Sequence, residues 1–267
     1  MRLPVLSLEW AVSLVALLGY VAAAWPLPSK ARWPEVALVI GWLAHGVALA
    51  LDIFGIGSDI PGARFGFAPA LSATVWIVLA VHTVESRLLP VLPVRRALGL
   101  AGTVVVLLAG AFPGEMRPQL GSPWLPLHWL LGLVSYGLFA AGVLHAMFLD
   151  TAERRLRGRA LAATPVAAGL PLMQLERLTF RFVEIGFVVL SVAILLGVWA
   201  SPTWRWDHKT VLSMLGWATF AVLIAGRHGR GWRGRQATRW IYVGALLLML
   251  AYIGSRFVLE VILRRGA

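Results

Sequence analysis

The sequence predicts an all-α, polytopic membrane protein, a helical bundle with about eight transmembrane helices. Of its 267 residues, 59% are hydrophobic and only 13% are charged, and the mean hydropathy is +0.79. A soluble domain cannot bury so much apolar surface, whereas apolar runs of about 20 residues match the ~30 Å hydrocarbon core of a bilayer. We therefore expect a single integral membrane domain over residues 1–267.

Eight apolar runs of suitable length follow one another along the chain. They cover about 6–25, 34–54, 67–85, 97–112, 124–150, 182–200, 211–225 and 238–263. Proline and glycine mark several of the connections, including a loop at 55–64. In the arginine-rich connector after the fifth run, the helix is expected to continue through Arg159. The stretch from Thr164 to Pro171 is expected to be irregular, because it combines two prolines with small residues.

The net charge of +12 indicates where the connectors lie and not a nucleic acid partner. Alternate connectors, around Lys30, Arg95, Arg154 and Arg233, collect most of the 24 lysines and arginines. Basic connectors face the cytoplasm, so both termini and the loop at 201–210 are expected outside, in a multi-pass protein of the bacterial inner (plasma) membrane. The absence of cysteine excludes disulfides, thiolate metal sites, covalent haem attachment through CxxCH and a cysteine nucleophile.

The loop at about 201–210 is the most unusual polar stretch, because tryptophans surround an Asp-His-Lys triplet there. The predicted cofactor-binding residues of the loop are Trp204, Trp206, Asp207 and His208. Its indoles can anchor the chain at the headgroup layer, or their flat rings can line a slot for a porphyrin. Arg205 and Lys209 are placed to meet haem propionates, and Asp207 either orients His208 or caps the following helix.

Histidines are the candidate metal ligands. The candidates are His128, His45, His208 and His228. An imidazole within a membrane span is a functional candidate by default, although a hydrogen bond between packed helices explains it equally well. Haem iron takes one or two axial ligands, whereas zinc needs three or four that converge, and no such spacing occurs. His128 is the predicted haem-iron ligand, because Pro126 fits the first helical turn and places this residue near the outer surface.

Several motifs come in an order that resembles the cytochrome c assembly family, which handles haem in membranes. They are Leu127-His128-Trp129, Trp204-x-Trp206-Asp207-x-Lys209 and Gly231-Trp232-Arg233-Gly234-Arg235. The length and the stretch Ala44-His45-Gly46 resemble most closely the small YpjD/HemX-like inner-membrane branch. This resemblance implies b-type haem held by histidine near an outer tryptophan-rich loop. It also implies partnership with other cytochrome c maturation proteins and no enzymatic turnover of its own.

Two departures from the large haem transporters of that family keep alternatives open. His208 and Thr210 stand where those proteins have proline and glutamate, and no histidine follows the last span. One alternative is therefore an accessory or regulatory membrane subunit with a vestigial haem site. Another is a small-molecule or ion transporter that uses Glu184, Arg256 and Glu260. The last two are four residues apart on one helix face, which also suits a plain intrahelical ion pair.

Overall fold

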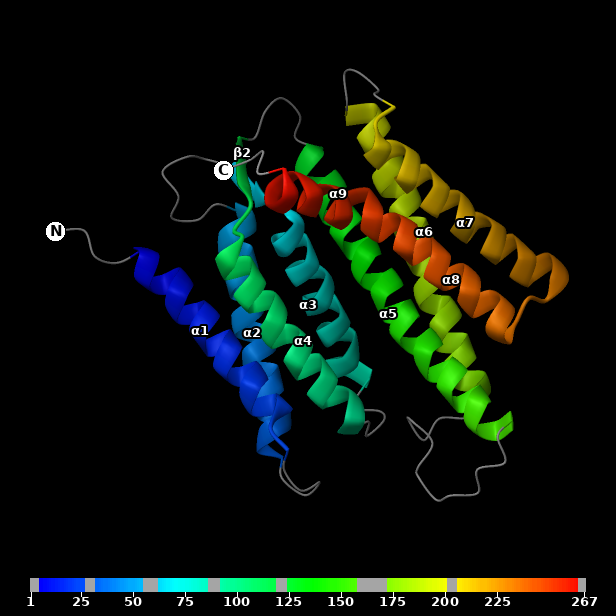
Figure 1. Ribbon diagram of the computed structural model, residues 1–267, viewed down its shortest axis with the longest axis horizontal. Coiled ribbons are helices and arrows are strands. Elements are labelled where there is room, and N and C mark those ends of the chain that lie inside the picture. Colours follow the sequence, from blue (N-terminus) through cyan, green and yellow to red (C-terminus); the bar gives the residue numbers. More distant parts are fainter. Residues whose placement is uncertain are drawn as a thin grey trace. The chain divides into compact units, whose positions relative to one another are not determined.

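The computed structural model describes residues 5–26, 32–54, 62–85, 92–118, 124–157, 172–200 and 206–263. Its long helices are α1 (Val5–Ala24), α2 (Trp33–Phe54), α3 (Phe67–Glu85), α4 (Leu92–Ala111), α5 (Leu125–Arg157), α6 (Leu172–Ala200), α7 (His208–Arg230) and α8 (Gly234–Met249) (Figure 1). Within these residues, seven helical segments are long and apolar enough to cross a membrane, and α1 adds a shorter apolar segment, Leu8–Ala24. The predicted all-α membrane bundle is confirmed.

The helices divide into two compact units, which are described separately. Unit 1 comprises Met1–Gly121 with Arg256–Ala267, and unit 2 comprises Ser122–Ser255. In unit 1, α1 packs against α2 and α4, and α3 packs against α4. A Cβ on Gly19 would stand only 2.7 Å from the Cα of Gly41, so the backbones of α1 and α2 touch. Small residues allow this close approach, which supplies packing where lipid provides no hydrophobic driving force.

Unit 1 also contains a small two-stranded sheet that the sequence did not predict. Strand β1 (Gly62–Phe65) pairs antiparallel with β2 (Glu115–Pro118), with Phe65 opposite Glu115. The loop predicted at 55–64 therefore ends in a strand; residues 55–61 lie outside the described ranges. Gly114 has a φ of 76°, and a Cβ there would lie 2.7 Å from the Phe65 carbonyl oxygen, so glycine is needed where the chain closes on β1.

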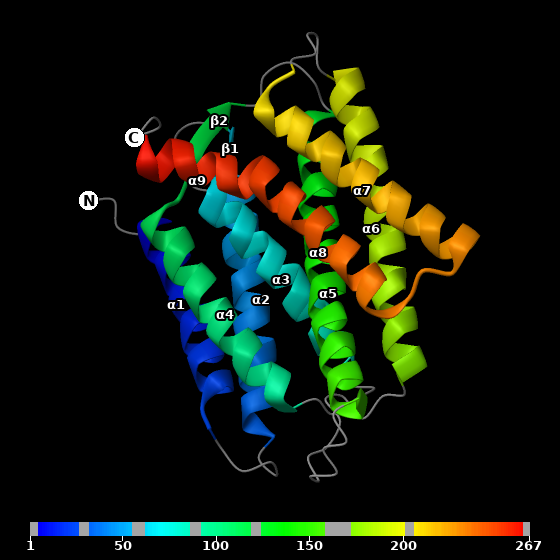
Figure 2. The ribbon, with the colours of Figure 1, turned by 45° about the vertical axis from the view of Figure 1, so that its right-hand side comes forward.

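Unit 2 is organised around α5, which packs against α6 and α8, while α7 packs against α8. Figure 2 shows α8 crossing α5 at an angle. The core contains a stacked pair, Phe139 and Phe220, with ring centroids 3.9 Å apart. Gly186 and Gly244 make room for this pair, because a Cβ on either would contact a ring at 3.2 Å or less. Glycine at helix contacts thus lets large aromatic rings fill the core.

Two helices of unit 2 extend beyond the apolar runs that predicted them. Helix α5 continues to Arg157, and α6 begins at Leu172, well before the start predicted at 182. The extension of α6 is held by polar contacts, since Glu176 accepts a hydrogen bond of 3.0 Å from Arg227. The length of an apolar run predicts only the part of a helix that lies inside the bilayer, so it does not predict such polar helix ends. The irregular stretch predicted from Thr164 to Pro171 lies outside the described residues, and the single-domain prediction stays a prediction.

The last predicted span, 238–263, is not one regular helix. After α8 come π-helical turns η1 (Leu250–Gly254) and η2 (Val258–Ile262), with the short α9 (Ser255–Phe257) between them. Hydrogen bonds in a π turn skip one residue more than in an α-helix, which disturbs the ladder of carbonyl acceptors. Just before η1, the Leu248 carbonyl accepts a hydrogen bond of 2.6 Å from the Tyr136 hydroxyl of α5. The irregular turn is thereby tied to the core of unit 2.

Candidate functional site

His128 lies in the first turn of α5, as predicted. Helix α5 begins at Leu125, Pro126 follows at its second position, and the His128 N–H donates to the Trp124 carbonyl at 3.0 Å. On the imidazole, Nδ1 lies 2.7 Å from the carbonyl oxygen of Ala193 in α6. A carbonyl can only accept, so Nδ1 carries the proton and Nε2 presents its lone pair. Such an anchored ring is the usual arrangement of a metal-binding histidine, whose second nitrogen is held by a backbone carbonyl.

Gly197 of α6 determines how closely the His128 ring approaches that helix. A Cβ on Gly197 would stand 2.7 Å from Cε1 and 3.0 Å from Nδ1 of His128. Only glycine therefore leaves the ring in its present place. By contrast, a Cβ on Gly132 of α5 would meet no described atom within 4 Å outside the backbone of its own helix. The glycine that allows the close contact is therefore the one on α6.

The start of α7 carries the polar part of the tryptophan-rich loop. Asp207 is the N-cap, and its Oδ1 accepts the Thr210 N–H at 2.8 Å, which confirms the capping role considered from the sequence. Burial raises the pKa of the Asp207 carboxyl, but the hydrogen bonds from Thr210 and the charge of Lys209 offset this, leaving the pKa below its ordinary value. His208 is exposed, and Lys209 places its Nζ 4.8 Å from the centre of the Tyr252 ring in η1.

The ends of α5 and α6 bring exposed indoles near His128, and the start of α7 brings a cation. Trp124 and Trp199 contact each other with ring centroids 5.5 Å apart, and Trp199 is 68% exposed. Trp206, just before α7, is 72% exposed. The Lys209 ammonium lies within electrostatic range of His128. Trp204 and Arg205 lie outside the described residues. We call the group of His128, Trp124, Trp199 and Lys209 the His128 site.

The other predicted ligands are held in different surroundings. In unit 1, His45 is buried between α1 and α3, and its ring nitrogens lie 2.9 Å from the Tyr20 hydroxyl and 2.7 Å from the Ser72 hydroxyl. His228 is exposed near the far end of α7, about 30 Å along that helix from His208. Its Nε2 lies 3.9 Å from Glu184. His45 therefore has hydrogen-bond partners at both nitrogens, and His228 is remote from the His128 site.

The donor set at the His128 site suits haem better than a bare metal ion. Within the described residues, no three side chains of His, Asp or Glu converge as a zinc site requires. Haem iron needs only one or two protein ligands, because the porphyrin supplies the others. In the described part of unit 2, no hydrogen bond engages Nε2 of His128, which leaves that nitrogen available for iron. Exposed indoles and an ammonium add the apolar and cationic partners that a porphyrin with propionates requires.

Comparison with known proteins decides the family. Residues 33–263 match the family described as "Cytochrome C assembly protein". The chain belongs to this family. It is 28% identical over 244 residues to the inner membrane protein YpjD of Escherichia coli strain K12, covering 88% of this chain and 91% of that protein. It is also similar to the cytochrome c biogenesis protein CcsA of Microcystis aeruginosa, with 25% identity over 295 residues covering 84% and 87% of the two chains.

A shorter match links this cytochrome c assembly protein to the CcsA protein of Synechococcus strain CC9902, 30% identical over 162 residues and covering 51% of this chain. No solved structure matches the chain significantly. The chain is thus a multi-pass membrane protein of the cytochrome c biogenesis family. Sequence reasoning placed His128 near the start of its helix but missed the Ala193 carbonyl that accepts a hydrogen bond from its ring, since a backbone acceptor has no side-chain signature. The contact of Gly197 with His128 could not be predicted from spacing either.

Proposed function

We propose that this cytochrome c assembly protein binds haem without a covalent link, as b-type haem, with Nε2 of His128 as an axial ligand. The observation that carries the proposal is the 2.7 Å hydrogen bond between Nδ1 of His128 and the Ala193 carbonyl. It fixes the tautomer and the ring orientation, and it increases the basicity of the ligating nitrogen. The anchored ring keeps Nε2 without a hydrogen bond among the described residues, so this nitrogen can bind iron.

The neighbouring residues take roles that their chemistry suits. Trp124 and Trp199 would form apolar walls beside the porphyrin. Lys209, with Arg205, pairs with the propionates by charge-assisted hydrogen bonds. Asp207 keeps the start of α7 in place through its cap on Thr210. His208 is exposed and adjacent to Lys209, which makes it the candidate for the second axial position.

The bound haem would be the prosthetic group that cytochrome c assembly handles. The residues of the chain would hold this haem and exclude water from it. In this proposal the protein has no chemical turnover of its own and works with other cytochrome c maturation proteins in the inner membrane. Both termini lie on the outer side, together with the His128 site. Alkaline phosphatase fused to the C-terminus should be active, and activity only of a cytoplasmic reporter there would contradict this orientation.

The transporter alternative loses support from the contacts of its charged residues. Arg256 lies 3.2 Å from Glu115 and 4.0 Å from Glu260, and Glu260 also accepts the Phe67 N–H at 3.4 Å. These charges are neutralised within unit 1 and favour a structural role. Glu184 lies near the exposed His228, at the end of α7 remote from the His128 site. The accessory-subunit alternative predicts a protein that does not bind haem. A haemin titration distinguishes this alternative from the proposed function.

The experiment is a titration of the purified protein with haemin, followed at the Soret band, for three forms of the protein. The wild type should bind with a histidine-type spectrum, and His128→Ala should bind weakly with a changed spectrum. His145→Ala is the matched control, because it removes a histidine about 25 Å farther along the same helix. Added imidazole should restore the spectrum of His128→Ala. An unchanged titration of His128→Ala would reject the ligand assignment, and no binding by the wild type would favour the accessory subunit.

A further inference from the structure

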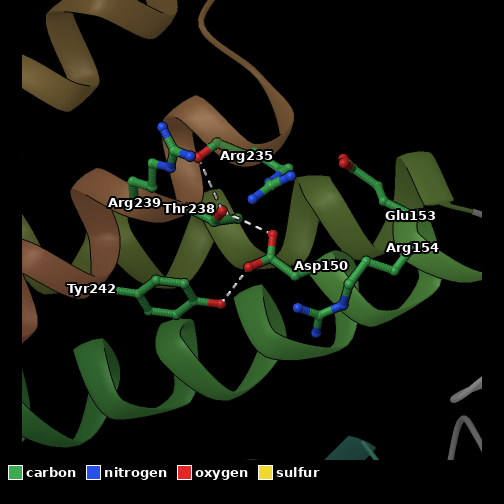
Figure 3. Close-up of a pocket in the computed structure, with 7 residues that line it drawn as sticks. All are labelled: Asp150, Glu153, Arg154, Arg235, Thr238, Arg239 and Tyr242. Carbon is green, nitrogen blue, oxygen red and sulfur yellow. Dashed lines mark hydrogen bonds between the residues drawn. The ribbon is translucent and has the colours of Figure 1, made fainter. Parts of the chain in front are cut away.

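A second polar site lies in unit 2 between α5 and α8, distinct from the His128 site. A cavity of about 200 Å³ opens there. Its lining consists of Asp150, Glu153, Arg154, Arg235, Thr238, Arg239 and Tyr242. Figure 3 shows these side chains gathered between the two helices. We call this the arginine pocket. It is lined by three guanidinium groups and two carboxylates, so its lining has a net positive charge.

The Asp150 carboxylate is already engaged at the floor of the pocket. Its Oδ1 accepts the Thr238 hydroxyl at 2.8 Å, and its Oδ2 accepts the Tyr242 hydroxyl at 2.9 Å (Figure 3). Thr238 is buried, so this network is a fixed part of the α5–α8 contact. The charge of Asp150 is thus spread over hydrogen bonds to neutral donors and is not paired with arginine.

The Glu153 carboxylate lies close to the start of α8. A Cβ on Gly234, the first residue of α8, would lie 3.0 Å from Oε1 of Glu153. The N-cap residue Arg233 provides no side-chain cap, so a nearby carboxylate complements the partial positive charge of the helix start. Asp150 is therefore engaged by the hydroxyls of Thr238 and Tyr242, and the Glu153 carboxylate lies against the start of α8.

The three arginines are left without ion pairs in the described part of the chain. Arg154 contacts only the hydroxyl of Thr151, at 3.3 Å, and neither Arg235 nor Arg239 has an ion pair among the described residues. Residues 155–171, which are the end of α5 and the connector after it, contain further arginines and no carboxylate. Guanidinium groups that share a cavity without carboxylate partners bind tetrahedral oxyanions well, because each offers a fork of N–H donors.

We propose that the arginine pocket binds a phosphate group, with Arg154, Arg235 and Arg239 as its donors. The cavity has room for a phosphate and its first substituent, but it is far too small for a porphyrin, so this site is separate from the proposed haem function. The phosphate belongs either to the headgroup of an anionic lipid or to a soluble phosphate compound. A site that fixes the phosphate by several guanidinium groups differs from the general attraction of basic connectors to anionic lipid.

Two matched double variants separate a built site from general attraction. Arg235→Gln with Arg239→Gln removes two pocket charges four residues apart on one helix. Arg177→Gln with Arg181→Gln removes the same charge with the same spacing from exposed positions of α6 outside the pocket. Loss of charge-assisted hydrogen bonds should weaken phosphate binding about tenfold or more in the first variant. The second variant should keep nearly wild-type affinity.

Two probes identify the source of the phosphate. Inorganic phosphate is titrated calorimetrically into the detergent-purified full chain. Phosphatidylglycerol retention is measured by native mass spectrometry after extraction from phosphatidylcholine nanodiscs with and without that lipid. If the pocket binds both probes, a soluble phosphate compound is sufficient as its ligand. If the pocket retains only the lipid, its ligand is a lipid headgroup. Equal behaviour of the two double variants, or no binding of either probe by the wild type, overturns the proposal.

Asp150→Asn provides a further test, because it should strengthen phosphate binding, whereas a folding defect would weaken it. The amide keeps the shape of the carboxylate and can still bond to the Thr238 and Tyr242 hydroxyls, while one negative charge leaves the pocket. Phosphate binding should therefore strengthen several-fold, because the anion no longer faces that charge. Binding of either probe that is weakened by Asp150→Asn in a protein with wild-type helicity contradicts the assignment.

Discussion

Replacing Gly197 by alanine tests whether the His128 ring must lie where the structure places it. The added methyl would stand 2.7 Å from Cε1 of His128, well inside van der Waals contact, so the ring must move. Movement strains the 2.7 Å hydrogen bond to Ala193, worth about 0.5–1.5 kcal/mol. Overpacking adds about 1–3 kcal/mol, and the better helix propensity of alanine returns about 1 kcal/mol. We expect a net destabilisation of about 1–3 kcal/mol.

Gly132→Ala is the matched control for this prediction, because it makes the same change on the partner helix. No described atom lies within 4 Å of the added methyl there, so only the propensity gain should remain. Thermal unfolding in detergent should show a lower melting temperature for Gly197→Ala alone. Haemin titration should show about 10–100-fold weaker binding, as is typical when the group that orients a metal-binding histidine is disturbed. Identical behaviour of the two variants would refute the proposed ring position.

Three further predictions concern the neighbouring residues. Asp207→Ala should cost about 1 kcal/mol at the start of α7. Because the folded-state pKa of Asp207 lies below its ordinary value, the cap is complete at neutral pH and is lost as the pH falls through that pKa, which hydrogen exchange of the first turn of α7 measures. His208→Ala should convert the haem spectrum from six- to five-coordinate, and an unaltered spectrum would exclude His208 as second ligand. His45→Leu leaves the hydroxyls of Tyr20 and Ser72 without their partner and should lower stability by about 1–3 kcal/mol. A stable variant with an altered Soret band would instead assign His45 to haem.

The sequence predicted those features that hydrocarbon length and local chemistry determine. The positions of the apolar helices follow from the run of residues that ~30 Å of lipid requires. The cap by Asp207 follows from an acceptor placed three residues before a backbone donor. Pro126 in the first turn of α5 follows from its missing N–H, and it placed His128 near the start of that helix.

Features that depend on partners distant in the chain could not be predicted. The contact between His128 and Ala193 joins residues 65 positions apart, and a backbone carbonyl is present at every position. The strand pair Gly62–Phe65 with Glu115–Pro118 is too short to show the alternation typical of strands. The arginine pocket depends on α8 crossing α5, which brings Thr238 into hydrogen-bond contact with Asp150 although the two residues are 88 positions apart in the sequence.

The most direct measurement of the central claim is the haem content of the protein purified from its own membranes. A pyridine haemochrome spectrum gives both the amount of haem and its type, and it can be compared between the wild type and His128→Ala after matched purification. We predict extractable b-type haem in the wild type and a large loss of it in His128→Ala, with normal protein yield. Equal haem content in the two proteins, or no haem in the wild type even when cells are supplied with it, would contradict the account.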